Sequence, residues 1–279
     1  MSNKNLVQIT TDENGREVVV ARVDKTLKEM MEEKPASRWN PAYWSPAYDY
    51  LDKLFSEVEA KSILEIEGEE AVIAGDHVRP SRGEKKGFNL NTGIEYYETA
   101  GFLDSGYDYS DIKECSNNAY LRLKETAVKK YDILISIAGV GGVGKAKSCI
   151  VTNEPAEKSC TGDVFSVRLK KINPIYFYIL LKSKIGKDQI LKMKNGVGTE
   201  NLNTKEALAI MVPEIRKEIQ DNIISEFKKM SKYHDKAMEA QKNSKEAEYK
   251  ENIEIAGKML KDLITKTEAV IRGEIKDII

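Results

Sequence analysis

The feature that most constrains this fold is the C-terminal stretch after Pro213, in which no further proline occurs up to Ile279. Proline suits the first turn of a helix, and the stretch behind it is rich in Lys, Glu, Ile, Ala and Met. Apolar residues recur there every three or four positions, which is the pattern of an amphipathic helix. We therefore expect a globular head, residues 1–212, followed by one long helix, residues 213–279.

An unbroken helix of this length would extend roughly 100 Å. A helix cannot bury its own apolar seam, so we expect a second copy of the chain to cover it in a coiled coil. The stretch Gln241–Asn252 is polar and interrupts the seam, and the alternative is a helical hairpin that bends there. The residues predicted for the dimer interface are Ile215, Ile219, Ile223, Phe227, Met230, Ile253, Leu260, Leu263 and Val270.

The charges nearly cancel, with 44 basic and 45 acidic residues, so only their distribution can indicate a partner. Between Val167 and Asn195, eight Lys or Arg residues stand against one acidic residue, Asp188. Smaller basic clusters lie at Arg79–Lys86 and Lys145–Lys147. A basic face on a neutral protein favours a polyanion such as double-stranded DNA, and the alternative is an ordinary solvated helix face.

The three cysteines, Cys115, Cys149 and Cys160, are odd in number and form no C-x-x-C pair. This usage indicates reduced thiols in a cytoplasmic protein. The polar start lacks the pattern of a signal peptide, and no apolar run approaches the roughly 20 residues that cross a bilayer. With only two histidines and no cysteine cluster, we expect neither a metal site nor a cofactor.

The head has the sequence pattern of an α+β fold with an irregular sheet. Asn14-Gly15 lies between two alternating runs, Leu6–Thr10 and Arg16–Val23, and predicts an N-terminal β-hairpin as an extension over residues 1–36. Helices are expected at Tyr50–Val58 and from Pro174 through Ile185, the latter with Asn173 as its N-cap. Short strands are expected at Leu64–Ala74, Gly93–Tyr97, Tyr120–Leu123, Ile133–Ala138, Ser148–Val151 and Val164–Leu169.

Two segments nearly match catalytic motifs. Gly139–Lys145 follows a predicted strand like a phosphate-binding loop, so a nucleotide hydrolase is an alternative function. Against it, Ala146 replaces the hydroxyl residue that binds magnesium, and a β-rich segment follows where a helix is required. Asn40–Tyr43 approaches the Asn-Pro-Pro-Tyr signature of adenine-N6 methyltransferases, but Ala42 replaces the second proline and no Gly-rich cofactor loop accompanies it. We therefore expect no catalysis by this chain.

A series of motifs follows in a fixed order from Ser37 onward. They are Ser37–Trp44, Tyr131–Gly139, Gly144–Ala146, Asn173–Tyr176, Asn195–Gly198 with Leu202-Asn203, and Val212-Pro213 before the long helix. This order resembles the specificity (S) subunits of type I restriction–modification systems. The resemblance implies a target recognition domain that binds DNA, a long helix behind it, and methylation and cleavage by partner subunits. The 1–36 extension and the polar stretch Gln241–Asn252 do not match the family.

A full subunit of this family has two such units, so the chain resembles a half-subunit. The resemblance then implies a homodimer that binds a bipartite target. It also implies docking of an adenine-N6 methyltransferase, with or without a nuclease/translocase subunit.

Recognition of DNA requires cations at phosphates and polar side chains at base edges, presented by turns that approach the duplex closely. The residues predicted for DNA contacts are Arg79, Arg82, Lys85, Lys86, Lys145, Lys147, Lys192, Lys194, Thr199 and Asn201. Most of the lysines are expected at phosphates, and Arg82 and the polar residues that follow Gly198 at bases. The remaining alternative is a coiled-coil protein-interaction module whose head binds protein.

Overall fold

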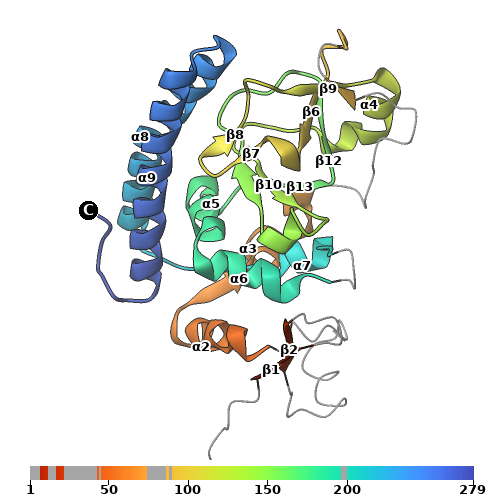
Figure 1. Cartoon of the computed structure of the whole chain (residues 1–279). Helices are drawn as coiled ribbons and strands as arrows, with labels where there is room; N and C mark the ends of the chain where they lie inside the picture. Colours follow the sequence, from red (N-terminus) through yellow and green to blue (C-terminus); the bar gives the residue numbers. More distant parts are fainter. Residues whose placement is uncertain are drawn as a thin grey trace, which may run out of the picture.

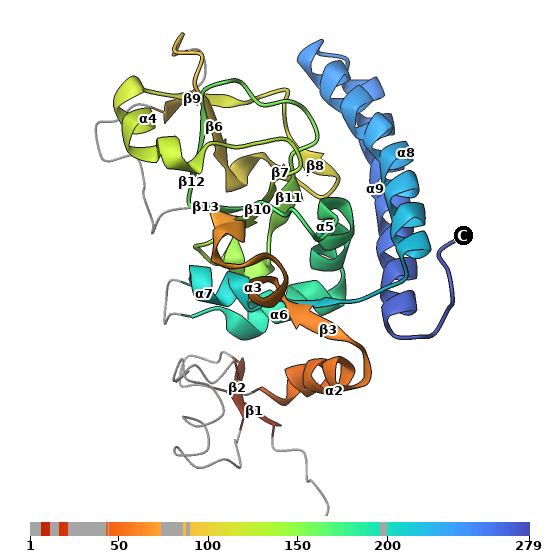
Figure 2. The ribbon, with the colours of Figure 1, turned by 180° about the vertical axis from the view of Figure 1, so that it is seen from behind.

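The computed structural model describes residues 7–11, 17–21, 43, 45–73, 86–87, 90–195 and 200–279, with the backbone alone at 7–11, 17–21 and 86–87. A head of mixed helices and strands is followed by two long helices that lie side by side along one flank of it (Figure 1, Figure 2). This arrangement confirms the expected α+β head with an irregular sheet and a long C-terminal helical region. No helix in these ranges is long and apolar enough to span a bilayer.

The centre of the head is an antiparallel sheet in the order β11–β10–β13–β4. Its strands are β4 (Val72–Ile73), β10 (Ile133–Ser136), β11 (Ser148–Ile150) and β13 (Val164–Val167). Every residue of β10, β11 and β13 is buried. Strands covered on both faces need apolar residues at successive positions, which explains why these segments are apolar without strict alternation.

A second sheet has the order β12–β6–β9–β5 and contains one parallel pair, β12 with β6. Its strands are β5 (Lys86–Gly87), β6 (Glu95–Glu98), β9 (Lys113–Cys115) and β12 (Ser159–Gly162). Three small pairs are β1 (Val7–Thr11) with β2 (Glu17–Ala21), β3 (Ala60–Ser62) with β14 (Met211–Pro213), and β7 (Phe102–Leu103) with β8 (Gly106–Tyr107). The first pair confirms the expected N-terminal β-hairpin.

The helices of the head are α2 (Asp49–Glu57), α3 (Ile63–Glu67), α4 (Asn117–Leu123), α5 (Pro174–Lys182), α6 (Lys184–Met193) and α7 (Thr204–Leu208). Asn173 caps α5 as expected, because its Oδ1 accepts hydrogen bonds from the amides of Ile175 and Tyr176. The helix stops at Lys182 instead of continuing through Ile185. Ser183 is extended and its Oγ accepts from the amide of Gly186, so it begins α6.

Two expected strands are helical in the structure. Ser62 and Glu65 form a capping box that starts α3, so only β4 remains as a strand within the expected Leu64–Ala74. Ser116 Oγ accepts a hydrogen bond from the amide of Ala119 at 3.2 Å and starts α4, which replaces the expected strand Tyr120–Leu123. In both places a serine cap decides the structure of a short apolar run whose periodicity is ambiguous.

The single long helix expected after Pro213 is wrong. The chain forms two helices of 26 residues each, α8 (Lys217–Lys242) and α9 (Glu246–Ile271), which pack as a hairpin. Each is about 39 Å long. The chain reverses at residues 243–245, inside the polar stretch where the alternative placed a bend. Ser244 there has φ 56°, a left-handed conformation that ends a helix.

The reversal supplies the second helix that the apolar seam requires. Helix α9 packs along α8, and α5 of the head packs against both helices. The ring of Phe227 in α8 lies edge-on to that of Tyr178 in α5, with centroids 6.0 Å apart. Six of the nine residues expected to join two copies are therefore buried within one chain, so an uncovered seam is no longer a reason to expect a homodimer. Buried in the core are Ile219, Ile223, Phe227, Met230, Leu260 and Leu263, whereas Ile215, Ile253 and Val270 are half-buried.

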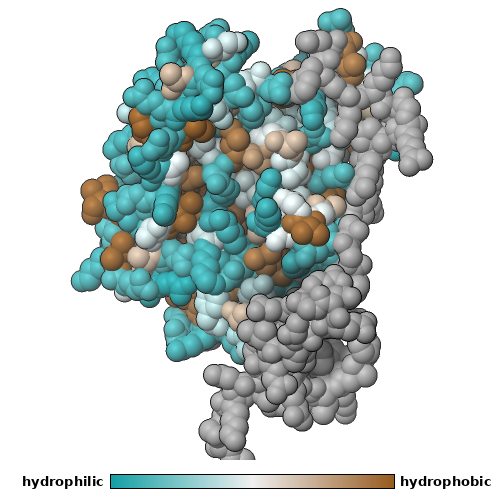
Figure 3. All heavy atoms as spheres, viewed as in Figure 1, coloured by the Kyte–Doolittle hydropathy of each residue, from teal (hydrophilic) through white to brown (hydrophobic). Residues whose placement is uncertain are grey.

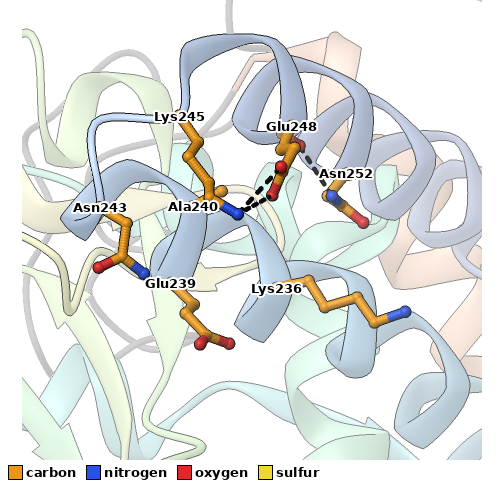
Figure 4. A pocket seen from close by; sticks show the side chains of 7 residues that line it. All are labelled: Lys236, Glu239, Ala240, Asn243, Lys245, Glu248 and Asn252. Atoms are coloured by element: carbon orange, nitrogen blue, oxygen red, sulfur yellow. Dashed lines mark hydrogen bonds and ion pairs between the residues drawn. The ribbon is translucent and has the colours of Figure 1, made fainter.

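A hollow of about 230 Å³ lies at the tip of the hairpin, at the end away from α6 (Figure 4). Lys245 Nζ lies 3.1 Å from both carboxylate oxygens of Glu248, and Asn252 Nδ2 donates to the Glu248 carbonyl at 2.7 Å. These contacts fix the first turns of α9. The hollow is lined by both charge signs, namely by Lys236, Glu239, Ala240, Asn243, Lys245, Glu248 and Asn252, so it favours neither an anion nor a cation.

Candidate nucleic-acid interface

The glycine-rich segment after β10 forms a tight turn that leads into the antiparallel strand β11. Gly139 has φ 85°, a conformation that L side chains rarely adopt. Its carbonyl oxygen accepts hydrogen bonds from the amides of Gly142 and Gly144, at 3.0 and 3.2 Å. A single 3-10 turn, η6 (Val143–Lys145), follows, and the side chain of Val143 is fully buried. The backbone of the turn is therefore fixed by its own hydrogen bonds and by an apolar anchor.

This geometry opposes the nucleotide-hydrolase alternative. A phosphate-binding loop leads into a helix whose N-terminus faces the phosphate, whereas this turn leads directly into β11. The carboxylate of Glu200 also lies against Gly144, so closely that a Cβ added to Gly144 would overlap it. The Glu200 carboxylate therefore lies against the loop backbone, where a phosphate-binding loop would hold its phosphate.

Asn195, Glu200 and Asn201 lie beside the first turn. Asn195 and Asn201 exchange two backbone hydrogen bonds of 2.7 Å. The amide of Gly139 donates to the carbonyl of Glu200 at 2.8 Å, and the amide of Leu202 donates to the carbonyl of Ile137 at 2.9 Å. The first turn is thus joined by backbone hydrogen bonds to Asn195, Glu200 and Asn201. We call residues 139–147 together with 195, 200 and 201 the joined turns.

The Glu200 side chain connects the two segments a second time. Its Oε1 forms an ion pair with Lys194 Nζ, and its buried Oε2 has no hydrogen-bond partner within the part of the chain that the structure describes. The side chain of Asn195 donates to Glu206, which forms a capping box with Asn203 at the start of α7. Glu200, expected among the polar residues that face bases, thus lies between Lys194 and the backbone of the first turn.

The four lysines expected to flank the turns fall into two pairs. Lys145 is exposed and Lys147 half-buried, and neither forms an ion pair in the described ranges. Lys194 is paired with Glu200, as described above. Lys192 Nζ contacts both carboxylate oxygens of Asp52 in α2, at 2.8 and 2.9 Å, and lies 5.2 Å from the ring centroid of Tyr43. Only the first pair is free to bind a phosphate without first losing a carboxylate.

Further positive charge surrounds Asp104, in the turn between β7 and β8. Lys182 Nζ lies 2.7 Å from its carboxylate and lowers the pKa of that carboxyl, and Lys187 and Lys147 add to the effect. Three lysines therefore act on one carboxylate, which leaves a net positive potential beside Lys147.

Several predicted contact residues cannot be placed. Arg79, Arg82, Lys85 and Thr199 lie outside the described residues, and Lys86 begins β5, where only the backbone is described. Most of the Asn40–Tyr43 segment also lies outside them. Tyr43 itself is buried, with the Lys192 ammonium over its ring. Asn201 is half-buried in the joined turns.

Sequence reasoning missed Val140, which is 63% exposed at the tip of the first turn. The signal that identifies it is an apolar residue between two glycines, Gly139 and Gly141, in a turn that also carries Lys145. On the face drawn in Figure 3, apolar residues form small separate groups on a mainly hydrophilic surface.

No protein-family model matches the chain. Over 159 residues it is 26% identical to the type I restriction enzyme EcoBI specificity subunit of Escherichia coli, a match that covers 57% of this chain and 32% of that protein. The chain therefore spans about a third of the length of this curated relative.

Two solved structures are also similar to this chain. The first, described as the structural basis of complex assembly and conformational transition of the type I R-M system, has a TM-score of 0.41 and 15% identity, over 82% of this chain and 52% of that one. The second is the type I restriction–modification S subunit from M. genitalium, with a TM-score of 0.37 and 11% identity, over 65% of this chain and 40% of that one. The resemblance predicted from the order of motifs is confirmed by the curated match, since over part of its length this chain is similar in sequence to a specificity subunit of a type I restriction–modification system.

Proposed function

We propose that this chain is a DNA-recognition subunit of a type I-like restriction–modification system, and that it binds double-stranded DNA with the joined turns. The observation that carries the proposal is a rigid backbone surface, fixed by the Gly139–Glu200 hydrogen bond, that carries two lysines without a carboxylate partner in the described ranges. The sequence relationship to a type I specificity subunit supports the same function.

Lys145 and Lys147 are proposed to bind phosphates, because neither must break an ion pair within the described residues before it neutralises a phosphate and releases counterions from DNA. Asn201 is proposed to face a base edge, where its amide can donate and accept. Lys192 and Lys194 are proposed as weaker phosphate contacts. Each must exchange a carboxylate, Asp52 or Glu200, for the phosphate.

The contacts proposed for Arg79, Arg82, Lys85, Lys86 and Thr199 rest on the sequence alone. These residues belong to a basic cluster and to a glycine turn, both of which suit a surface that follows a phosphate backbone.

The chain is proposed to perform no catalytic step itself. Methylation would come from an adenine-N6 methyltransferase subunit that docks on it, and cleavage from a nuclease/translocase subunit where one is present. The structure supports a scaffold of this kind in one respect. The outer face of the hairpin carries exposed ion pairs such as Lys258–Glu254 and Lys266–Asp262. Because these side chains do not pack in the core, this face is available to a docking subunit.

Sequence selection from a pool of random duplexes tests the proposal. The full chain, together with its methyltransferase subunit, is expected to enrich one defined sequence. The double variant Lys145→Ala/Lys147→Ala is expected to lose most of that binding. The matched control Lys258→Ala/Lys266→Ala removes the same charge from α9 and is expected to enrich the same sequence as the wild type. A folded wild-type chain that enriches no sequence would instead favour the protein-interaction module.

A further inference from the structure

Val140 occupies an unusual position in the joined turns. It is a β-branched apolar residue, 63% exposed, at the tip of a turn. A single exposed apolar side chain is common on protein surfaces and by itself has no functional meaning. Three further observations distinguish Val140: the rigidity of its turn, the open space beside it, and the charge of its surroundings.

The turn holds Val140 in one place. Its backbone is closed by hydrogen bonds from Gly142 to Gly139 and from Lys145 and Lys147 to Gly142, each between 3.0 and 3.1 Å. Val143 and Ala146, at 0% and 2% exposure, anchor its far side in the core. A side chain presented by a fixed backbone loses little conformational entropy when it binds.

The glycines of the turn have different reasons to lack a side chain. Gly142 and Gly144 are required by packing, since a Cβ would overlap Ser136 Oγ at the first and the Glu200 carboxylate at the second. Gly139 is required by its φ of 85°. Gly141 is required by neither, because a Cβ there would meet nothing within 4 Å and its φ is not left-handed. The fold therefore does not require a glycine at position 141, but the absence of a side chain there leaves room for a ligand to approach Val140.

The charge around the tip identifies the ligand class, given the proposed function on which this step rests. Lys145 and Lys147 come within a few residues of Val140 in the same turn and form no ion pair in the described ranges. A rigid apolar tip in a turn that also carries two such cations fits a groove of duplex DNA, with the cations at the phosphates on its rim.

We propose that Val140 enters the major groove and packs against the C5-methyl group of a thymine in the target. That methyl group is the apolar feature which base pairs expose in the major groove. Side chains that wedge between bases and kink DNA are longer, such as Phe, Leu, Ile or Met, and valine is too short for this task. Val140 is thus a residue that determines specificity for a T·A pair at one position of the target.

The test replaces each thymine of the selected target, one at a time, with deoxyuridine, which lacks only the methyl group. Dissociation constants are measured for the full chain and for Val140→Ala. For the wild type, one substitution is expected to weaken binding about fourfold, the value of one buried methyl group. Val140→Ala should bind the unmodified target more weakly by a similar factor, and the same deoxyuridine should then have no further effect.

Two outcomes would contradict the role of Val140 but leave the proposed function intact. In the first, Val140→Ala binds the unmodified target as tightly as the wild type does. In the second, each deoxyuridine weakens binding of Val140→Ala by the same factor as it weakens binding of the wild type. A wild-type chain that selects no DNA sequence would overturn both that role and the proposed function. Gly141→Ala is a second variant that spares the protein fold. It should keep the thermal midpoint of the wild type yet weaken target binding, and unchanged binding would contradict close approach of DNA to the tip.

Discussion

The backbone amide of Gly139 donates a hydrogen bond of 2.8 Å to the carbonyl oxygen of Glu200. This bond joins two segments that are about 60 residues apart in the sequence. Because of it, the backbone that carries Lys145 and Lys147 and the backbone that carries Asn201 are held in a fixed relative position. The DNA-recognition account depends on that rigidity, since a base contact is specific only when its position relative to the phosphate contacts is fixed.

Alanine substitutions at three glycines, two in the first turn and one in α9, are expected to change the free energy of unfolding by different amounts. Gly142→Ala places a Cβ 2.6 Å from the carbonyl oxygen of Ala138. Because this oxygen belongs to the backbone and cannot swing away, the substitution should lower the free energy of unfolding by about 2 kcal/mol. Gly144→Ala meets the end of the Glu200 side chain, which can swing away, and should cost less. Gly257→Ala in α9 meets open space and should stabilise by up to about 1 kcal/mol. Urea unfolding measures all three, and equal midpoints for the first two would contradict this packing.

His234 fastens the hairpin to the head and should make stability depend on pH. Its Nε2 lies 2.9 Å from the Tyr107 carbonyl, which can only accept, so Nε2 donates and Nδ1 accepts from the Ser105 hydroxyl at 2.8 Å. Burial lowers the pKa of His234 below its ordinary value of 6.5, although Asp108 and Asp235 act in the opposite direction.

The sign of the effect follows from linkage. The unfolded chain binds the proton of His234 more readily than the folded chain, so stability is full above pH 6.5 and falls as the pH drops below it. We expect the free energy of unfolding to decrease from pH 7 to pH 5.5. His234→Gln, which does not titrate, should be less stable at pH 7 but show a flatter profile. Parallel profiles for the two proteins would show that carboxylates alone cause the decrease.

Because the apolar seam of α8 is buried within the chain, substitutions in it should lower the stability of the chain and not its oligomeric state. Phe227 is 1% exposed and packs on Tyr178, so Phe227→Ala should destabilise the whole chain by about 3–5 kcal/mol rather than release folded heads from a dimer. The chain alone should sediment as a monomer at tens of micromolar. A dimer that Phe227→Ala dissociates, with an unchanged unfolding midpoint of the head, would show that the hairpin opens and pairs between copies.

Turn and cap residues in the sequence correctly predicted the elements that such short-range signals determine. Asn14-Gly15 predicted the β1–β2 pair, and Asn173 predicted the start of α5. The reversal at Ser244 carries neither glycine nor proline, and packing of both helices on α5 decides it, so periodicity alone favoured one helix. The basic DNA-binding surface stays a prediction from the lysine positions, and the pairing of Lys192 and Lys194 with Asp52 and Glu200 could not be predicted because it depends on contacts between distant segments.

The salt dependence of DNA binding tests the central claim most directly. The association constant for the selected target is measured from low to moderate salt for the wild type and for two double variants. Lys145→Ala/Lys147→Ala should lower the slope of log K against log salt by about two, because each lysine neutralises one phosphate. Lys192→Ala/Lys194→Ala should lower it by less, because these lysines are already paired. A slope for Lys145→Ala/Lys147→Ala equal to that of the wild type would show that DNA does not bind at the joined turns.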